Sequence, residues 1–476
     1  MSSSFLWFAS IVMLELVSAF TSFSGTAHSA ALVIAAFIMM FFAYRYPSIA
    51  ASALLVEYVI GSKGALLRFG GDGMGHGGIP LRIALFVAFV VGWLFWSIQH
   101  KTYRDWPLYV RGRGVYVCLA IMLGYAFLRG MYLNNTFVFE DANAWGVWML
   151  LLPALDLTHH LAPHLRRDIP RAVGAAFVMM TLKTLVLFYL FAHLTDGFWL
   201  NVIYLWVRRT GVGELTHVLV GSSAWRVFFQ SHIYVLPVIL GGLWYALSAQ
   251  NMKRRGWIFS VLAAATLIVS LSRSLVIGVV GGGIASLGYG FGMKRVEGVS
   301  GLKYLVGTTS AALLLVGMLF YAPPHSIGSL TNLFASRTDM SGEAAVSRWV
   351  LLPALWKGIT HHPVLGSGFG AIVTYQSHDP RLVATANGAY TTYAFEWGWL
   401  DHWFKLGIFG IPLMMWIVIR LAARSWRTPL PLWIRGTLVT SLFALATTHV
   451  FTPYLNHPLG IVWLVSVEAW LSMKYA

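Results

Sequence analysis

Long apolar runs are the feature that most constrains how this chain folds. A helix that crosses a lipid bilayer needs roughly 20 mainly apolar residues, and runs near that length recur from one end of the sequence to the other. They lie at about 5–20, 28–43, 48–61, 81–98, 114–130, 144–160, 172–193, 232–248, 256–272, 274–292, 302–321, 403–421, 433–450 and 457–473. We therefore predict an all-α polytopic membrane protein with roughly 12–14 transmembrane helices.

Composition agrees with this class. Of the 476 residues, 58% are hydrophobic and only 11% are charged, whereas a soluble protein carries about 25% charged residues. The formal net charge of +16 would suggest nucleic-acid binding in a soluble protein. In a membrane protein it follows from the Lys and Arg of cytoplasmic loops, so we expect membrane lipids and no nucleic acid among the partners. The single cysteine, Cys118, excludes an intrachain disulfide and a multi-cysteine metal site.

The basic loops predict the orientation. With fourteen spans and the N-terminus inside, every cluster of basic residues falls on the cytoplasmic face. These clusters lie within 101–113, 166–171, 253–255, 294–303 and 420–435. Residues 5–20 are then a retained first span and not a removed signal peptide.

One connection is far longer than the others. We predict a single transmembrane domain over residues 1–476, in which residues 322–402 form a periplasmic loop between the eleventh and twelfth spans. Loops of this length are usually functional or disordered. Apolar residues at helical spacing around 349–356 favour order, so we expect a helix on the membrane surface followed by a packed cap.

Several arginines lie on the predicted outer face, against the positive-inside bias. Arg226 and Arg273 stand next to predicted spans, and Arg337, Arg348 and Arg381 lie in the long loop. Arginine presents a planar fork that suits phosphate, so a phosphorylated, lipid-embedded ligand is one interpretation. Pairing with carboxylates, or contact with lipid headgroups, is the other.

The stretch "EWGWLDHWFKLGIFG" (396–410) places charges where an apolar run begins. Asp401 and Lys405 are four residues apart and are expected to pair along a helix. Glu396 and His402 are left as candidates for a general base, with Glu396 preferred. Just upstream, "HHPVLGSGFG" (361–370) lacks the Lys-Ser/Thr of a phosphate-binding P-loop.

The remaining histidines and buried charges predict no further site. His159, His160 and His164 have no Glu in the zinc-protease pattern, and we expect no metal there. The acidic and basic residues within spans are scattered, and a pairing such as Glu57 with Lys183 would satisfy them.

Four segments together resemble the O-antigen ligase and O-antigen polymerase superfamily. They are "RVFFQSHIYVLPVIL" (226–240), "LSRSLVIGVVGGG" (271–283), the Arg-to-glycine segment 348–370, and "WLDHWFKLGIFG" (399–410). No single motif is specific to this superfamily. The order of the four segments, their spacing and their shared place on the predicted outer face are more specific in combination. The resemblance covers about residues 226–421.

The resemblance implies an integral membrane glycosyltransferase of the bacterial inner membrane, with its site on the periplasmic side. The donor would be a glycan on undecaprenyl diphosphate, and the acceptor a glycan or a lipid-linked unit. Arg226 and Arg273 match arginines that hold the diphosphate, Arg348 matches the arginine of the outer-loop helix, and His361 and His362 are further substrate-binding candidates. No cofactor and no metal are expected, and a chain-length regulator protein is a candidate partner.

One departure from the family pattern guides the choice of reaction. Ligases carry a His-Asn-type pair about eleven residues before the glycine that here is Gly407, and this chain has Glu396 and Trp397 there. We therefore favour an inverting, metal-independent polymerase of O-antigen or exopolysaccharide repeat units. The alternatives are an O-antigen ligase acting on lipid A-core, a transporter or flippase of lipid-linked sugars, and a non-catalytic membrane scaffold.

Overall fold

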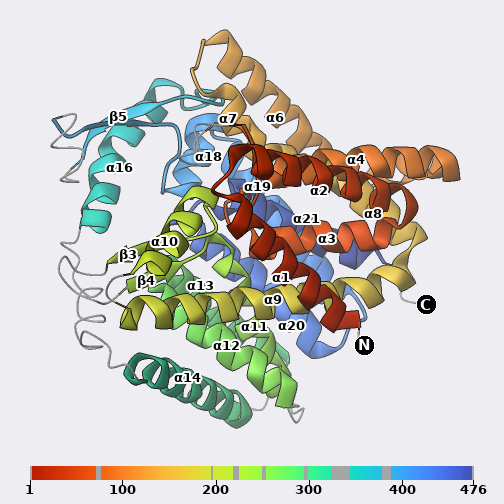
Figure 1. Ribbon diagram of the computed structural model, residues 1–476. Helices are drawn as coiled ribbons and strands as arrows, with labels where there is room; N and C mark the ends of the chain where they lie inside the picture. Colours follow the sequence, from red (N-terminus) through yellow and green to blue (C-terminus); the bar gives the residue numbers. More distant parts are fainter. Residues whose placement is uncertain are drawn as a thin grey trace.

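The computed structural model describes residues 3–70, 77–194, 197–217, 225–248, 254–293, 298–322, 343–377 and 387–473. Most of them lie in helices that run roughly side by side (Figure 1). The helices of the first half are α1 (Ser3–Thr21), α2 (Gly25–Arg45), α3 (Pro47–Ile60), α4 (Leu81–His100), η1 (Thr102–Asp105), α5 (Trp106–Val110), α6 (Gly114–Tyr132), α7 (Val138–Trp145), η2 (Gly146–Leu150), α8 (Leu151–His160), α9 (Ala162–His193) and α10 (Phe198–Thr210).

The second half continues the bundle. Its helices are η3 (Gln230–Tyr234), α11 (Val235–Leu247), α12 (Arg254–Ser270), α13 (Arg273–Met293), α14 (Gly298–Tyr321), α16 (Glu343–His361), α18 (Gly398–Leu406), α19 (Gly410–Arg427), α20 (Leu432–Thr448), η4 (Tyr454–Asn456) and α21 (Pro458–Ser472). The described residues also form three two-stranded antiparallel sheets. In these sheets β1 (Arg68–Phe69) pairs with β2 (Ile79–Pro80), β3 (Glu214–His217) with β4 (Trp225–Phe228), and β5 (Val373–Gln376) with β6 (Ala389–Thr392).

The helices match the predicted apolar runs. Each of the fourteen runs overlaps a helix, and the run at 144–160 falls on the broken segment α7–η2–α8. Within the described residues, six helices are long and apolar enough to cross a membrane, and α3, α20 and α21 are shorter apolar helices. This confirms an all-α chain of membrane type, while the number of spans stays a prediction.

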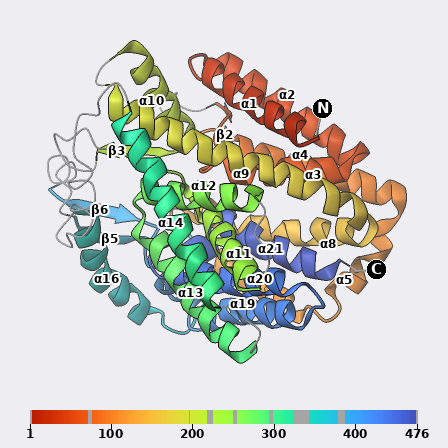
Figure 2. The ribbon, with the colours of Figure 1, turned by 90° about the horizontal axis from the view of Figure 1, so that it is seen from below.

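Helix α9 organises the bundle. It packs against α1 and α3 on one side and against α12 and α14 on the other, so it lies between the N-terminal helices and the α11–α14 group (Figure 2). Its central face buries small side chains such as Ala172, Ala176 and Thr184. Such a face lets neighbouring helices approach closely, which is how helices associate in a membrane.

The two ends of the bundle differ in character. One end, which we call the cap face, carries α16, β5, β6 and α18, at the left of Figure 1. The opposite end, the basic face, carries the start of α6 and the ends of α19 and α21. There Arg113, Arg420 and Arg424 all contact the buried carboxylate of Glu468. Two of the basic clusters in the sequence therefore meet at the same end of the molecule.

The long connection before α19 is ordered in its described parts. Helix α16 stands across the direction of α9 (Figure 1), and its buried residues Leu351, Leu355 and Ile359 pack against Phe395 and Phe404. The spacing of four residues puts the three side chains on one face of the helix. Of the predicted outer arginines in this connection, Arg337 and Arg381 lie outside the described residues.

The glycine-rich turn at 366–370 fits tightly between other backbones. A Cβ on Gly368, where φ is +74°, would lie 2.5 Å from the Gly130 nitrogen at the end of α6. Nearby, Arg129 Nε donates to the Gly366 carbonyl at 2.6 Å, and Asn135 donates to the Ser367 carbonyl at 2.9 Å. The turn therefore links the cap face to α6 through close backbone packing and hydrogen bonds.

The charges inside the bundle are paired, but not as the sequence suggested. Glu57 pairs with Arg82 at 2.8 Å, and Lys183 pairs with Glu15 at 2.5 Å. The predicted pairing of Glu57 with Lys183 is therefore wrong. Helix α3 packs against both α4 and α9, yet Glu57 reaches the cation on α4, and Lys183 of α9 reaches Glu15 on α1. Which neighbouring helix supplies the partner depends on side-chain positions in the packed bundle, which the linear sequence does not reveal.

Candidate functional site at the cap face

The connection between α20 and α21, residues 449–457, is the centre of the cap face. Thr452 donates to the Ser274 hydroxyl at 2.8 Å, which ties it to the first turn of α13. Tyr454 donates to the Gln230 carbonyl at 2.9 Å, which ties it to the segment that follows β4. This connection therefore joins the two regions that contain Arg273 and Arg226.

Arg226 and Arg273 are held at the same short turn. Arg226, on β4, donates from Nε to the Ser270 carbonyl at 2.9 Å, and its guanidinium lies 4.5 Å from the centre of the Phe228 ring. Ser270 is the last residue of α12, and Arg273 is the first residue of α13. The structure thus brings together two arginines that are 47 positions apart in the sequence.

The beginning of α13 is suited to an anion. The N-terminus of a helix carries a partial positive charge and exposes backbone N–H groups. Here the hydroxyls of Ser272 and Ser274 lie 3.3 Å apart in the first turn, beside the two arginines. A phosphate or diphosphate is the kind of group that such donors bind.

Arg348 and Glu396 form an ion pair on the cap face. Arg348 Nε contacts Glu396 Oε2, and the two side chains are 29% and 50% exposed. Trp397 donates from its indole to the Arg348 carbonyl at 2.9 Å, and its ring packs 5.5 Å from that of Phe451. The pair is therefore anchored to the α20–α21 connection, while the Glu396 carboxylate stays open to solvent.

His402 occupies a different environment. Only 1% of it is exposed, and its Nδ1 lies 3.1 Å from His449 Nε2 and 2.9 Å from the Gly398 carbonyl. The Leu455 N–H donates to His449 Nδ1 at 3.1 Å, so neutral His449 carries its proton on Nε2. Burial lowers the pKa of His402 to about 4. This enclosure argues against the alternative assignment of His402 as the base.

Lys405 lies between two carboxylates. It contacts Asp401 at 2.9 Å, which confirms the pairing expected along the helix, and Asp141 of α7 at 2.7 Å. Asp141 also accepts the Gly370 N–H at 2.9 Å, and Asn456 donates to Asp401. Burial raises the pKa of Asp401 to about 7, although the Lys405 charge opposes it. Through these contacts the network connects α7, α18, the glycine turn and the α20–α21 connection.

His361 and His362 are exposed at the end of α16. The thirteen residues from Arg348 to His361 correspond to about 20 Å along a helix. The structure therefore does not bring these histidines to the Arg348–Glu396 pair, and their predicted role in substrate binding stays a prediction.

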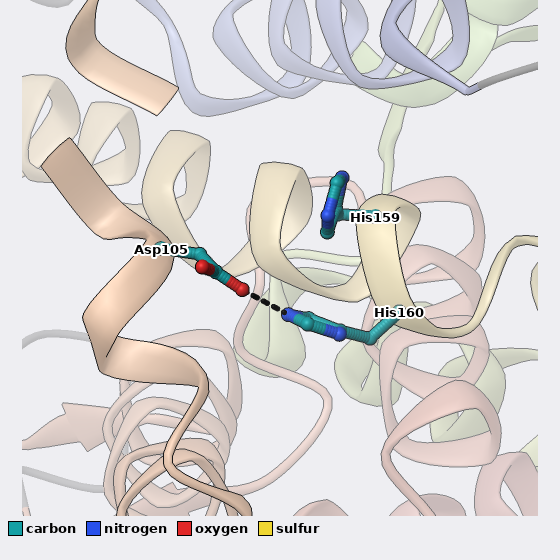
Figure 3. A group of neighbouring side chains, drawn as sticks. All are labelled: Asp105, His159 and His160. Atoms are coloured by element: carbon teal, nitrogen blue, oxygen red, sulfur yellow. Dashed lines mark ion pairs between the residues drawn. The ribbon is translucent and has the colours of Figure 1, made fainter. Parts of the chain in front are cut away.

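A separate cluster lies near the basic face, where Asp105 of η1 meets His159 and His160 of α8 (Figure 3). Their ligand atoms all lie within 4.8 Å of one another. His160 Nε2 is 3.3 Å from Asp105 Oδ2 and 3.2 Å from the Tyr109 hydroxyl. His160 therefore has a carboxylate and a hydroxyl as partners, and the expectation that no metal binds here stays a prediction. His164, which the sequence grouped with the other two histidines, is not part of this cluster.

Sequence reasoning missed several residues of the cap face. Asp141, His449, Thr452 and Asn456 join the site through tertiary contacts. The available signal was the polar stretch "THVFTPYLNH" (448–457), which separates two apolar runs on the predicted outer side. Polar residues in such a connection mark a place where the chain has contacts other than lipid.

Comparison with known proteins gives no match to any family model, curated protein or solved structure.

Proposed function

We propose that this chain is a membrane glycosyltransferase that extends a polysaccharide on the cap face, which is then the periplasmic side of a bacterial inner membrane. The donor is a glycan on undecaprenyl diphosphate, and the acceptor is a hydroxyl of another glycan. The observation that carries the proposal is that the segments with Arg226, Arg273 and the Arg348–Glu396 pair are all attached to the α20–α21 connection.

The reaction requires a charge binder and a base. The acceptor oxygen attacks the anomeric carbon of the donor, and the bond from that carbon to the diphosphate oxygen breaks. Undecaprenyl diphosphate leaves with the bonding electrons, and Arg226 and Arg273 stabilise the charge that develops on it. Glu396 takes the proton of the acceptor hydroxyl. A single displacement of this kind inverts the anomeric centre.

The ion pair with Arg348 suits Glu396 to this task. The contact from Arg348 Nε to Oε2 holds the Glu396 carboxylate in a fixed position on the cap face. Because half of the Glu396 side chain is exposed, an acceptor hydroxyl can approach it from the solvent side. Arg348 is then a positioning residue, while Glu396 contacts the reacting atoms.

The test is chain extension by purified protein in vesicles that contain lipid-linked repeat units. Glu396→Gln and Arg273→Ala should abolish extension while the protein still inserts. Lys357→Gln, an exposed substitution on α16, is the control that should leave extension unchanged. Normal polymer from both site variants would overturn the proposal.

The lipid-linked material in cells that lack the protein separates a polymerase from a ligase. A polymerase predicts accumulation of single lipid-linked repeat units, because nothing joins them. A ligase predicts full-length polymer that stays on its lipid carrier. Transport of lipid-linked sugar in vesicles without an acceptor would instead favour a flippase.

A further inference from the structure

An apolar groove runs along the outside of α6. It has a volume of about 410 Å³ and lies between α6 and the broken segment α7–η2–α8. Leu119, Leu123 and Phe127 line it on the α6 side, and Trp145 and Trp148 line it opposite. From Tyr116 to Phe127 the groove follows eleven residues of helix, or about 16 Å, which is the scale of a lipid acyl chain.

Small residues keep this groove open. Gly124 and Gly146 both line it, and a Cβ added to either would meet no atom within 4 Å. The neighbouring α6 side chains Ile121 and Leu128 are each 68% exposed. In a membrane this face of α6 contacts lipid, so the groove opens toward hydrocarbon.

The basic-face end of the groove is next to a cluster of arginines. Tyr116 lines the groove and donates to Glu468 Oε2 at 2.9 Å. Arg113 and Arg420 also contact the Glu468 carboxylate, at 2.8 and 2.7 Å, and Arg424 makes a third contact. Three arginines around one glutamate leave a formal charge of +2.

The arginines are not all equally engaged. Arg113 donates to Glu468, to the Tyr109 carbonyl and to the Ser472 hydroxyl. Arg424 donates to Glu468 and, over longer distances of 3.3 and 3.5 Å, to the Leu471 carbonyl and the Ser472 hydroxyl. Within the described residues, Arg420 makes one hydrogen bond, to Glu468, and its guanidinium lies 5.4 Å from the centre of the Tyr116 ring. The Arg420 and Arg424 side chains are 19% and 29% exposed. Their excess positive charge therefore reaches the surface beside the groove.

We propose that this groove binds one acyl chain of an anionic phospholipid from the leaflet at the basic face, with the lipid phosphate held by Arg420 and Arg424. Basic pockets between membrane helices bind anionic headgroups in this way. The +2 cluster favours a headgroup with net negative charge over a zwitterionic one, while the apolar walls favour the hydrocarbon chain.

The other end of the groove does not offer the same charge. Phe369 and Trp145 line the groove there, with ring centres 6.0 Å apart. Arg129, in the last turn of α6, donates to the Gly366 carbonyl, and Lys405 nearby is buried between Asp141 and Asp401. The charge pattern therefore favours a phospholipid headgroup at the basic face over a polyprenyl phosphate that enters from the cap face.

Native mass spectrometry of the detergent-purified protein tests this site with phosphatidylglycerol, phosphatidylcholine and undecaprenyl phosphate as probes. We expect phosphatidylglycerol to be retained about tenfold more strongly than phosphatidylcholine, which corresponds to about 1.4 kcal/mol. Gly124→Leu, which fills open space, and Arg420→Gln should each reduce that preference at least threefold.

Matched controls lie elsewhere on the bundle. Gly317→Leu adds a side chain in similarly open space on α14, on the opposite side of the bundle from α6 (Figure 1). Arg45→Gln removes an exposed arginine at the end of α2. Both should retain the preference. Equal retention of the two phospholipids, an unchanged preference in Gly124→Leu, or stronger retention of undecaprenyl phosphate that Gly124→Leu abolishes would each overturn the proposal.

Discussion

Arg348 and Glu396 contact each other across the cap face although 48 positions separate them in the chain. From the sequence alone, Arg348 is expected to bind phosphate and Glu396 to act as a base. Because both side chains are partly exposed, the pair contributes no more than the roughly 0–1 kcal/mol typical of surface ion pairs. Its contact is thus easily exchanged for a substrate group, which suits a functional role better than a structural one.

The first prediction concerns Glu396 as the base. Replacing it with Gln keeps the shape of the side chain but removes the proton acceptor. Glycan extension should fall by about 10²- to 10⁴-fold, the usual contribution of general-base catalysis, while thermal stability in detergent stays near that of the wild type. The rate of extension and the melting temperature are measured on the same preparation.

A charge swap separates the base from the ion pair. The double variant Arg348→Glu/Glu396→Arg restores the pairing but moves the carboxylate to α16. We expect it to stay as inactive as Glu396→Gln, because the carboxylate no longer faces the acceptor hydroxyl. Recovery of extension in the double variant would mean that the pair itself is all that the site requires.

The second prediction concerns Lys405. Its replacement by Met leaves the buried carboxylates of Asp401 and Asp141 without their shared cation. Breaking a buried pair in this way typically costs about 3–5 kcal/mol, so the melting temperature should fall clearly. Lys357→Met, an exposed lysine on α16, is the control and should have little effect. Equal melting temperatures for the two variants would show that the buried network does not hold the cap face.

The third prediction is a pH dependence. Burial lowers the pKa of His402 from its ordinary 6.5 to about 4, so between these values the unfolded chain binds the proton more readily than the folded one. Stability from this residue is therefore complete above pH 6.5 and is lost as pH falls toward 4. One pKa unit corresponds to 1.36 kcal/mol, so the loss amounts to about 3 kcal/mol.

His402→Gln isolates that effect, because Gln does not titrate. The stability advantage of the wild type over this variant should shrink as pH falls from 7.5 to 5. Asp401 titrates in both proteins, so its contribution largely cancels in the comparison. A constant difference in melting temperature across this range would contradict the buried, neutral state of His402.

The fourth prediction concerns the glycine turn. Gly368→Ala would place a Cβ 2.5 Å from the Gly130 backbone nitrogen at a positive φ, a clash that backbone atoms cannot easily relieve. We expect a marked loss of folded protein in detergent by size-exclusion chromatography. Gly124→Ala, whose Cβ meets open space, should elute as the wild type does, and similar losses in both would argue against the tight fit.

The apolar runs predicted the helices well. A segment in lipid must satisfy its own backbone hydrogen bonds, and it forms a helix to do so whichever helices pack beside it. The pairing of Asp401 with Lys405 was also predictable, because it depends only on helical spacing. The partners of Glu57 and Lys183 were not, because α3 packs against both α4 and α9 and the choice between their cations depends on side-chain positions in the packed bundle. Asp141 and His449 were not predicted for the same reason. Each contacts residues of the site that are far away in the sequence, and no local sequence pattern indicates such contacts.

Vesicles that contain the purified protein and undecaprenyl-diphosphate-linked repeat units distinguish glycan transfer from transport of the lipid-linked unit. We expect that the glycan lengthens, that undecaprenyl diphosphate is released in step with it, and that both signals are lost in Arg273→Ala. Movement of the lipid-linked unit across the bilayer with no lengthening and no release would contradict this expectation.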